Sequence, residues 1–490
     1  MTITDDFYSM DGQGNLDRQE LLDTEFFQIR YTDVPGKFLA KYVFSQNEDP
    51  QDFFRSGIGV DGSSVRGFVS IDESDLLLLP DRSTLRRAPI SNYKVATVIA
   101  DVYWGFGRGR LARDPRYVCQ RMEEHLAQEG LVSWVGPEVE CFIFDDIVLG
   151  EGNPKIVSVE QSSQGKYPIR RKGGYDAPPF EDSLLEVRFE IAEMLKRNYL
   201  IKVTNLNHEV ASSGQIEINF MHNTLTKAAD NVQVYKDVVR DVAKKHGKVA
   251  NFMPKPIFDQ NDPRSSESDN GSGMHTSVSI WTKSGSEDSS SSSTRNIFYD
   301  RNDEYTELSQ AGRYFIGGIL NHVSSLTALV APTVNSYYRL VPGFEAPVYA
   351  AWSKGNRSAI VRVPVNYRGN AESKRIEFRA PDPSANPYLA FSAILAAGMD
   401  GIKKKIDPGD SVNEDIYKMS DSARSSKGIK SLPGSLRESL QALKSDSDYL
   451  KPCFDGELIE SYVSLKQSEI SYVGDEGGSK LRQFMLYYDV

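Results

Sequence analysis

Short apolar runs mark the first hundred residues, and they predict strands separated by turns. Segments 26–31, 76–79 and 95–102 are rich in aromatic, leucine or β-branched residues, a composition typical of strands. Turn sequences containing Pro35-Gly36 and Pro80-Asp81 close the first two segments, because proline and glycine favour turns. We therefore expect a small α+β domain that ends near residue 110.

Helical patterns begin after this region and alternate with further strand-like runs. The segments expected to be helices are 115–130, 184–197, 225–249, 386–405, 435–447 and 456–470. The segments expected to be strands are 134–144, 214–220, 274–281, 358–364 and 375–380. This alternation predicts a second, larger α+β domain. Two polar stretches, 259–269 and 284–294, lack the apolar residues that a core requires and are expected to be loops.

Composition narrows the possible functions of the 490-residue chain. The formal net charge is −11, which argues against a general nucleic-acid binder, because such proteins present a basic surface to the phosphates. No run of 18 apolar residues is present, so no membrane helix is expected. The polar start and the three widely spaced cysteines fit a reducing compartment without a disulfide framework. We expect a soluble cytoplasmic enzyme that acts on neither nucleic acid nor membrane.

Charged and polar residues recur at a spacing of two in four of the expected strands. Because side chains alternate across a strand, residues spaced by two share one face. The groups are Glu138 and Glu140; Gln215, Glu217 and Asn219; His275, Ser277 and Ser279; and Arg375, Glu377 and Arg379. Any one of these strands alone is most simply an ordinary half-buried strand with a solvated face.

Four such strands in one sheet would gather the glutamates and the histidine on a common face. Buried carboxylates at close range repel one another unless a cation neutralises them. An oxygen-rich set with one imidazole favours Mg²⁺ or Mn²⁺ over Zn²⁺. Five arginines suited to phosphate or carboxylate accompany them: Arg339, Arg357, Arg362, Arg375 and Arg379. This combination indicates phosphoryl transfer, although no GxxxxGK[ST] phosphate loop is present.

Several longer motifs resemble those of type I glutamine synthetases, the bacterial and archaeal form. They are DGSSVRGF (61–68), GPEVECFIF (136–144), KGGY (172–175), NHEVASSGQIEINF (207–220), KPIF with NGSGMH (255–275), RLVPGFEAP (339–347), NRSAIVRVP (356–364) and RIEFRAPDPSANPYLAF (375–391). The resemblance implies an ATP-dependent glutamate–ammonia ligase that forms L-glutamine through γ-glutamyl phosphate. It also implies an N-terminal β-grasp-like domain (1–110), a catalytic domain (111–490) with a curved antiparallel sheet flanked by helices, and a dodecamer of two hexameric rings.

The same resemblance assigns roles to individual residues. One metal site would comprise Glu140, Glu209 and Glu217, and a second, toward the nucleotide phosphates, Glu138, His275 and Glu377. The glutamate-binding set would be Asn270, Gly271, Arg339 and Arg379, with Glu140 nearby, and the nucleotide and phosphate set would be Ser279, Arg357, Arg362 and Arg375. Asp61 and Ser64 would reach a neighbouring subunit's site, where Tyr175 and Glu209 complete the ammonium pocket. Glu345 would close over the intermediate as a flap.

Three residues depart from the family pattern around the purine, and they leave the nucleotide preference open. Ser277 stands where many relatives have histidine, His222 where an aromatic residue is usual, and Glu372 where a basic residue is frequent. Tyr417 falls where some relatives carry a nucleotidylated tyrosine, but its context differs, and we expect an exposed loop residue.

Two alternative functions remain at this point. An amine or polyamine ligase of the same chemistry should lack the acidic ammonium pocket, whereas Asp61, Ser64, Tyr175 and Glu209 are all present. A non-catalytic structural or regulatory relative should have lost metal ligands, and all six expected ligands are present. The residues therefore favour glutamate–ammonia ligation.

Overall fold

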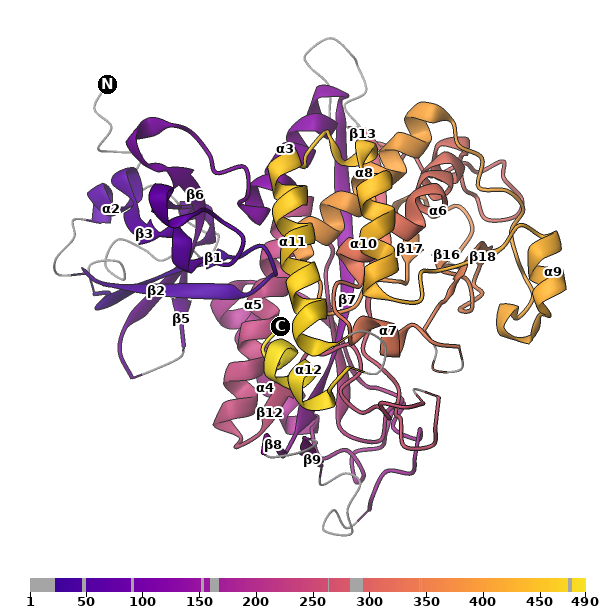
Figure 1. Ribbon diagram of the computed structural model, residues 1–490, viewed down its shortest axis with the longest axis horizontal. Coiled ribbons are helices and arrows are strands. Elements are labelled where there is room, and N and C mark those ends of the chain that lie inside the picture. Colours follow the sequence, from indigo (N-terminus) through magenta and orange to yellow (C-terminus); the bar gives the residue numbers. More distant parts are fainter. Residues whose placement is uncertain are drawn as a thin grey trace.

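The computed structural model describes residues 23–45, 50–89, 92–150, 154–158, 167–262, 264–282, 294–342, 344, 346–365, 367–474 and 478–490. An N-terminal sheet, drawn in indigo, lies at one side of the molecule, and the rest of the chain forms a larger body around a second sheet (Figure 1). Among the described helices, none combines the length and the apolar composition that a membrane crossing requires.

The N-terminal sheet has the strand order β2-β1-β6-β4-β3, and β5 also pairs with β6. Its elements are β1 (Phe26–Thr32), β2 (Phe38–Phe44), α2 (Pro50–Ser56), β3 (Ile58–Asp61), β4 (Asp75–Pro80), β5 (Arg86–Ala88) and β6 (Val95–Trp104). β1 and β6 run parallel at the centre, and the other pairs are antiparallel. The three strands expected here from the sequence are confirmed as β1, β4 and β6.

The second sheet has the order β10-β11-β7-β13-β17-β16-β15, and β12 also pairs with β7. Its strands are β7 (Leu131–Phe144), β10 (Val203–His208), β11 (Gln215–Phe220), β12 (Val249–Asn251), β13 (Met274–Thr282), β15 (Trp352–Lys354), β16 (Val361–Val363) and β17 (Ile376–Phe378). Neighbouring strands are antiparallel apart from β15 and β16, which are parallel. All five strands expected from the sequence in this region are therefore part of one sheet.

Strand register places the expected acidic residues beside one another. Glu140 of β7 lies opposite Glu217 of β11, and Glu138 lies between Asn219 of β11 and His275 of β13. Directly paired side chains of an antiparallel sheet point to the same face and lie close together. The register therefore produces the cluster that the spacing of two predicts.

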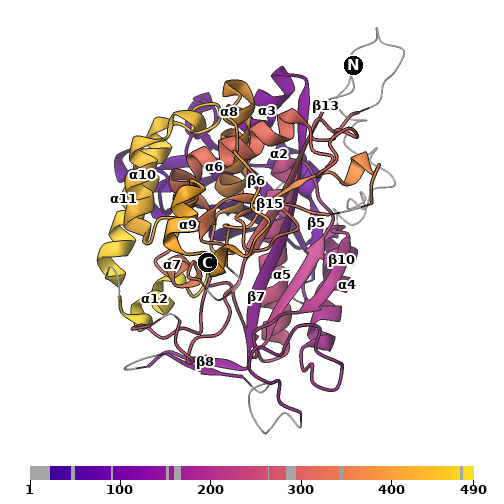
Figure 2. The ribbon, with the colours of Figure 1, turned by 90° about the vertical axis from the view of Figure 1, so that its right-hand side faces the viewer.

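Helices cover the second sheet, and α4 and α5 lie along its β7 and β10 side (Figure 2). The helices of this body are α3 (Pro115–Gln128), α4 (Leu185–Tyr199), α5 (Leu225–Lys245), α6 (Gln310–Val330), α7 (Ser336–Arg339), α8 (Pro387–Lys404), α9 (Asp421–Ser426), α10 (Leu436–Ser445), α11 (Gly456–Val473) and α12 (Lys480–Tyr487). Two small antiparallel two-stranded sheets pair β8 (Asp146–Val148) with β9 (Lys155–Val157) and β14 (Tyr349–Ala350) with β18 (Lys430–Ser431).

Local sequence explains where the long helices begin and end. Asn386 caps α8 by accepting a hydrogen bond from the backbone N–H of Tyr388, and Pro387 fills the first helical position, as is favoured at helix starts. The helix expected over 225–249 ends earlier, at Lys245. Gly247 adopts a φ of 66°, a left-handed conformation that ends helices, and Val249 already belongs to β12.

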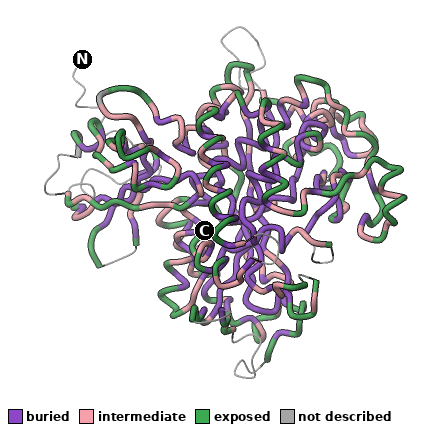
Figure 3. The backbone as a smooth tube through the Cα atoms, in the orientation of Figure 1, coloured by how far each residue is buried: buried purple, intermediate pink, exposed green. Residues whose placement is uncertain are grey.

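Buried residues concentrate in the body around the second sheet, and exposed residues lie at its periphery (Figure 3). A second, small apolar cluster is separate from the main core and consists of Val348, Tyr349, Ala351, Ala359, Val412 and Ile416. It packs the chain that follows residue 346 against the segment around residue 416. This arrangement fixes a strip of chain that borders the candidate site.

Candidate active site

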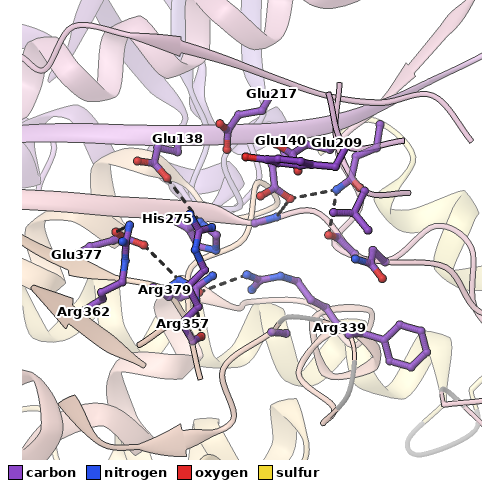
Figure 4. Close-up of a pocket in the computed structure, with 18 of the residues that line it drawn as sticks. Glu138, Glu140, Glu209, Glu217, His275, Arg339, Arg357, Arg362, Glu377 and Arg379 are labelled. Atoms are coloured by element: carbon purple, nitrogen blue, oxygen red, sulfur yellow. Dashed lines mark hydrogen bonds and ion pairs between the residues drawn. The ribbon is translucent and has the colours of Figure 1, made fainter. Parts of the chain in front are cut away.

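A cavity of about 740 Å³ opens on the polar face of the second sheet (Figure 4). The expected site residues that line it are Glu138, Glu140, Tyr175, Glu209, Glu217, Asn270, Gly271, His275, Arg339, Arg357, Arg362, Glu377 and Arg379. These residues span more than two hundred positions of the sequence. The structure therefore brings most of the expected site residues together in one place.

Glu138, His275 and Glu377 form a compact group from three adjacent strands. Each offers one ligand atom, and these atoms lie within 4.8 Å of one another. His275 Nδ1 lies 3.6 Å from a carboxylate oxygen of Glu138. Burial and the nearby Arg379 lower the pKa of His275 well below its ordinary value, so the imidazole is neutral, the form that coordinates metals. Two carboxylates and a neutral imidazole suit a divalent cation.

A second acidic group lies deeper in the cavity, around Glu140. One carboxylate oxygen of Glu140 accepts hydrogen bonds from the backbone N–H of Gly273 (2.7 Å) and from Gln215 (3.1 Å). Burial, with the nearby Glu209 and Glu217, raises the pKa of Glu140 well above its ordinary value. Because the protein alone does not neutralise these carboxylates, a bound cation would favour their ionised form.

Glu217 belongs to the same acidic group, and two amides orient it. Its Oε1 accepts hydrogen bonds from Asn207 (3.1 Å) and Asn219 (2.8 Å). Burial and the nearby Glu138 raise the pKa of Glu217 to about 7. Neutral amide donors thus hold the Glu217 carboxylate in place. They do not compensate the negative charge of the group around Glu140 and Glu217.

Arginines compensate the charge on the opposite side of the cavity. Glu377 forms ion pairs with Arg362 and, at 3.2 Å, with Arg379. Arg339 is buried and donates to the carbonyls of Ala380 (2.8 Å) and Arg379 (3.2 Å). The cavity is therefore polarised, with glutamates along one wall and guanidinium groups along the other (Figure 4). Such a wall of arginines suits phosphate or carboxylate groups.

Two glycines allow this close packing. A Cβ at Gly273 would lie 2.9 Å from a guanidinium nitrogen of Arg339 and 3.0 Å from His275 Nε2. A Cβ at Gly271 would lie 2.5 Å from the carbonyl oxygen of Pro254. Any larger residue at these positions would displace the groups that form the cavity wall.

A second cavity of about 670 Å³ adjoins the first and shares Glu138 and Asn219 with it. Two of the four expected nucleotide-site residues, Ser279 and Arg375, line this second cavity, whereas Arg357 and Arg362 line the first. The three departures from the family pattern, His222, Ser277 and Glu372, also line the second cavity. Burial and the nearby Arg375 lower the pKa of His222, so its ring is neutral.

Apart from Ser279 and Arg375 in the second cavity, two of the expected site residues that the structure describes do not join the cavity of this chain. Asp61 and Ser64 do not line it; they lie at an exposed turn where Asp61 accepts hydrogen bonds from the hydroxyls of Ser63 (2.6 Å) and Ser64 (2.7 Å). These hydrogen bonds lower the pKa of Asp61, which keeps the carboxylate ionised. Glu345, the expected flap residue, lies outside the described residues.

The expectation that Tyr417 is an exposed loop residue is wrong. Tyr417 is half-buried and lines the cavity, and its hydroxyl donates to the carbonyl oxygen of Ala346 at 2.8 Å. The apolar cluster around Tyr349 and Ile416 holds it there, a long-range packing that no local pattern indicates. Phe344 also lines the cavity and was not predicted as a site residue, although it stands within the RLVPGFEAP motif.

The structure describes most of one polar insert, 259–269, and little of the other, 284–294. Most of insert 284–294 lies outside the described residues. The described residues of insert 259–269 form a loop, with the backbone N–H of Asp259 bonded to the Ser268 hydroxyl at 3.0 Å, and none of them lines either cavity.

Comparison with known proteins gives a consistent result over nearly the whole chain. The family models for "Glutamine synthetase, beta-Grasp domain" and "Glutamine synthetase, catalytic domain" match residues 23–105 and 112–478. The glutamine synthetase of Sulfolobus acidocaldarius is 47% identical, over 91% of this chain and 92% of its own length. That of Streptomyces filamentosus is 38% identical, over 96% and 97%.

Solved structures agree with these relatives. A glutamine synthetase of Plasmodium falciparum superposes with a TM-score of 0.78 at 26% identity, covering 93% of this chain and 94% of that chain. A GmaS/ADP complex superposes with a TM-score of 0.75 at 28% identity, covering 94% and 96%. The N-terminal β-grasp domain and the helix-flanked sheet of this chain agree with these matches. The chain therefore belongs to the glutamine synthetase family of ATP- and divalent-metal-dependent glutamate–ammonia ligases.

Proposed function

We propose that the cavity on the second sheet is where this chain joins ammonia to the γ-carboxylate of L-glutamate. The reaction passes through γ-glutamyl phosphate and gives L-glutamine, ADP and phosphate. The observation that carries the proposal is the convergence of Glu138, His275 and Glu377 beside a wall of arginines in one cavity. Carboxylates for cations and guanidinium groups for phosphates are what phosphoryl transfer requires.

The two acidic groups fit two divalent cations, Mg²⁺ or Mn²⁺. Glu138, His275 and Glu377 would hold one, and Glu140, Glu209 and Glu217 would hold the other. The raised pKa values of Glu140 and Glu217 support this assignment, because they reflect negative charge that lacks a counter-charge. When bound, such cations offset charge on the nucleotide phosphates and on the transferring phosphoryl group.

The chain's own residues supply the remaining binding functions. Arg357 and Arg362 would contact the transferring phosphate, while Ser279 and Arg375 bind the rest of the nucleotide in the adjoining cavity. A similar structure, the GmaS/ADP complex, holds ADP, which supports a nucleotide role for one of the two cavities. Asn270, Gly271, Arg339 and Arg379 would bind glutamate, with its γ-carboxylate directed toward the shared wall at Glu138.

The proposed ammonium site is not complete within the cavity of a single chain. Tyr175 and Glu209 line the cavity, but Asp61 and Ser64 lie away from it. We propose that the loop of residues 61–64 enters the cavity of a neighbouring subunit, where Asp61 and Glu209 bind ammonium and take its proton. We also propose that the division between the two domains lies near residue 110 and that the chains assemble as a dodecamer of two hexameric rings.

A coupled assay of phosphate release tests the function directly. Release that requires ATP, glutamate and ammonium together supports ammonia ligation. Release that requires an added amine or polyamine instead would indicate the related ligase, and no release with any acceptor would indicate a non-catalytic relative. Product identification by chromatography then separates glutamine from other γ-glutamyl amides.

A further inference from the structure

Arg357, one of the two arginines proposed to contact the transferring phosphate, lies in a turn that the chain makes after β15. The turn spans residues 355–358, and Arg357 is exposed and lines the first cavity. Among the residues that the structure describes, none forms a hydrogen bond or ion pair with its guanidinium group. The place of this long side chain therefore depends on how the backbone of the turn is held.

The preceding residue, Asn356, uses every hydrogen-bonding position of its side-chain amide to hold this turn. Such an amide has two N–H donors and an oxygen with two lone pairs. Its Nδ2 donates to the carbonyl oxygens of Val412 (2.9 Å) and Glu414 (2.9 Å). Its Oδ1 accepts from the backbone N–H (3.0 Å) and the hydroxyl (2.7 Å) of Ser358. Although Asn356 lines the cavity, its amide has no position left for a ligand.

The segment 412–416, to which Asn356 is bonded, is itself held by the fold. The backbone N–H of Ile416 donates to the Ser358 hydroxyl at 3.1 Å, and that of Val412 donates to the carbonyl oxygen of Trp352 at 2.9 Å. Val412 and Ile416 are buried in the small apolar cluster. The residues on both sides of Arg357 are therefore bonded to a segment that is packed in place.

A third contact comes from Arg379, whose guanidinium group donates to the backbone carbonyl of Arg357 (Figure 4). Burial lowers the pKa of Arg379, Glu377 opposes this effect, and the positive charges of Arg362 and Arg357 lower the pKa further. These arginines therefore repel one another while no phosphate lies between them. A turn that was not held by Asn356 would let Arg357 move away from the other guanidinium groups.

We propose that Asn356 is a positioning residue that holds Arg357 beside the path of the transferring phosphoryl group. The inference rests on the proposed function of the cavity. In the transfer, the bond between the γ-phosphorus and the bridging oxygen of ADP breaks, and a bond to a γ-carboxylate oxygen of glutamate forms. A guanidinium group stabilises the charge on the transferring oxygens only if it already lies in place. A displacement of about 1 Å costs on the order of 100-fold in rate.

Steady-state kinetics of glutamine formation by the full-length protein test this role. Asn356→Ala removes the four hydrogen bonds of the amide and leaves the guanidinium group of Arg357 unchanged. We expect kcat to fall about 10- to 100-fold and KM for ATP and glutamate to change less than about threefold, because the contact acts mainly in the transition state. A kcat equal to that of the wild type would overturn the inference.

A double-mutant cycle separates positioning from a merely structural role. Arg357→Ala alone should lower kcat by at least about 100-fold. If Asn356 acts through Arg357, adding Asn356→Ala to this variant should lower kcat no further. Losses that multiply would overturn the inference, and so would unchanged turnover in Arg357→Ala. Absence of glutamine synthesis in the wild type would instead contradict the proposed function.

Asn386 is a matched control, because its amide makes similar hydrogen bonds away from the cavity. It donates to the carbonyl oxygens of Asp33 and Val34 (both 3.1 Å) and accepts from the backbone N–H of Tyr388 (3.1 Å). Asn386→Ala should lower the melting temperature and change kcat by less than about threefold. An equal loss of kcat in Asn386→Ala and Asn356→Ala would overturn the inference.

Ser358→Ala is a milder variant that tests the same turn where Asn356→Ala does not fold. It breaks the hydrogen bond from Ile416 and the one from the Ser358 hydroxyl to Asn356. We expect kcat to fall about 3- to 10-fold, again with no further loss in the Arg357→Ala background. Unchanged kcat in Ser358→Ala would count against the inference.

Discussion

Acidic and basic side chains lie side by side in the cavity, and Glu377 is a clear example. It is buried, it belongs to the proposed cation group, and it forms ion pairs with both Arg362 and Arg379. Glu377→Ala should nearly abolish turnover, because the group loses one of its carboxylates. The protein should stay folded, with the free energy of unfolding lowered by roughly 3 kcal/mol as the arginines lose their partner.

Calorimetric titration with Mn²⁺ measures the lost binding, and phosphate release measures turnover. Glu377→Gln is the matched control for shape, since it keeps the volume and removes the charge; it should lose cation binding as well. Turnover like that of the wild type in either variant would contradict the assignment of Glu377 as a ligand.

Lys236 of α5 offers a prediction on stability that is independent of catalysis. It is fully buried, and burial together with Arg240 lowers its pKa from 10.5 to about 7, while Asp382 and Cys141 act in the opposite direction. Between these two pH values the unfolded chain holds a proton that the folded protein lacks. The free energy of unfolding should therefore rise with pH through this window.

Lys236→Met should remove this dependence and stabilise the protein at neutral pH by a few kcal/mol. Denaturant unfolding at several pH values between 7 and 10.5 measures both effects. Lys244→Met, at an exposed position of the same helix, is the control and should change stability by less than about 0.5 kcal/mol. An unchanged pH slope in Lys236→Met would show that Lys236 titrates normally in the folded state.

The residues that sequence reasoning found and missed differ in how they reach the cavity. Glu138, Glu140 and Glu217 lie on long strands, where a spacing of two decides the face that a side chain occupies. Tyr417 lies in a single-turn 3₁₀ helix and Phe344 in an irregular segment, and their places in the cavity follow from packing between distant parts of the chain. No periodic pattern encodes such packing, so these residues could be placed only from the fold.

At the scale of elements, helices α6 and α8 pack closely because glycines remove side chains from their contact. A Cβ at Gly318 of α6 would lie 2.1 Å from the carbonyl oxygen of Ala397, and one at Gly401 of α8 would lie 2.2 Å from that of Tyr314. Since backbone atoms are the obstacle, the helices would have to separate. Gly318→Ala should lower the free energy of unfolding by about 1–3 kcal/mol.

Thermal unfolding measures this loss, and Gly456→Ala is its control. Gly456 is the first residue of α11, and a Cβ there meets no other atom within 4 Å. Alanine favours helix more than glycine does, so this variant should be neutral or slightly stabilising. Equal melting temperatures for Gly318→Ala and the wild type would show that the two helices adapt without cost.

The hydrophobic pattern predicts where helices and strands lie along the chain, but not how they pack against one another. Helical periodicity placed the segments that became α3, α4 and α8 within a few residues of their observed ends. The periodicity carries no information on which helices touch, or on the strand order β10-β11-β7-β13-β17. Apart from the consecutive strands β10 and β11, the neighbours in this order come from distant parts of the chain, and tertiary packing sets their order.

At the scale of the whole molecule, Arg116 of α3 joins the N-terminal sheet to the larger body. It donates to Asp230 of α5 at 3.0 Å, to Asp101 at 2.6 Å and to Asp81 at 2.7 Å. A buried arginine with three carboxylate partners holds both parts in a fixed relation, because separating them would leave buried charges unpaired. The loop with Asp61 is therefore held in a fixed position outside the cavity of its own chain.

This geometry predicts that two inactive variants restore activity when they assemble together. Asp61→Asn lacks the proposed ammonium ligand of the neighbouring site, and Glu377→Ala lacks a cation ligand of its own site. In rings assembled at random from equal amounts of both, about a quarter of the interfaces combine an intact Asp61 with an intact Glu377. Refolding or co-expression of the two variants should therefore recover about a quarter of wild-type glutamine synthesis. If Asp61 served the cavity of its own chain, every site would keep one defect, and the mixture would remain as inactive as either variant alone.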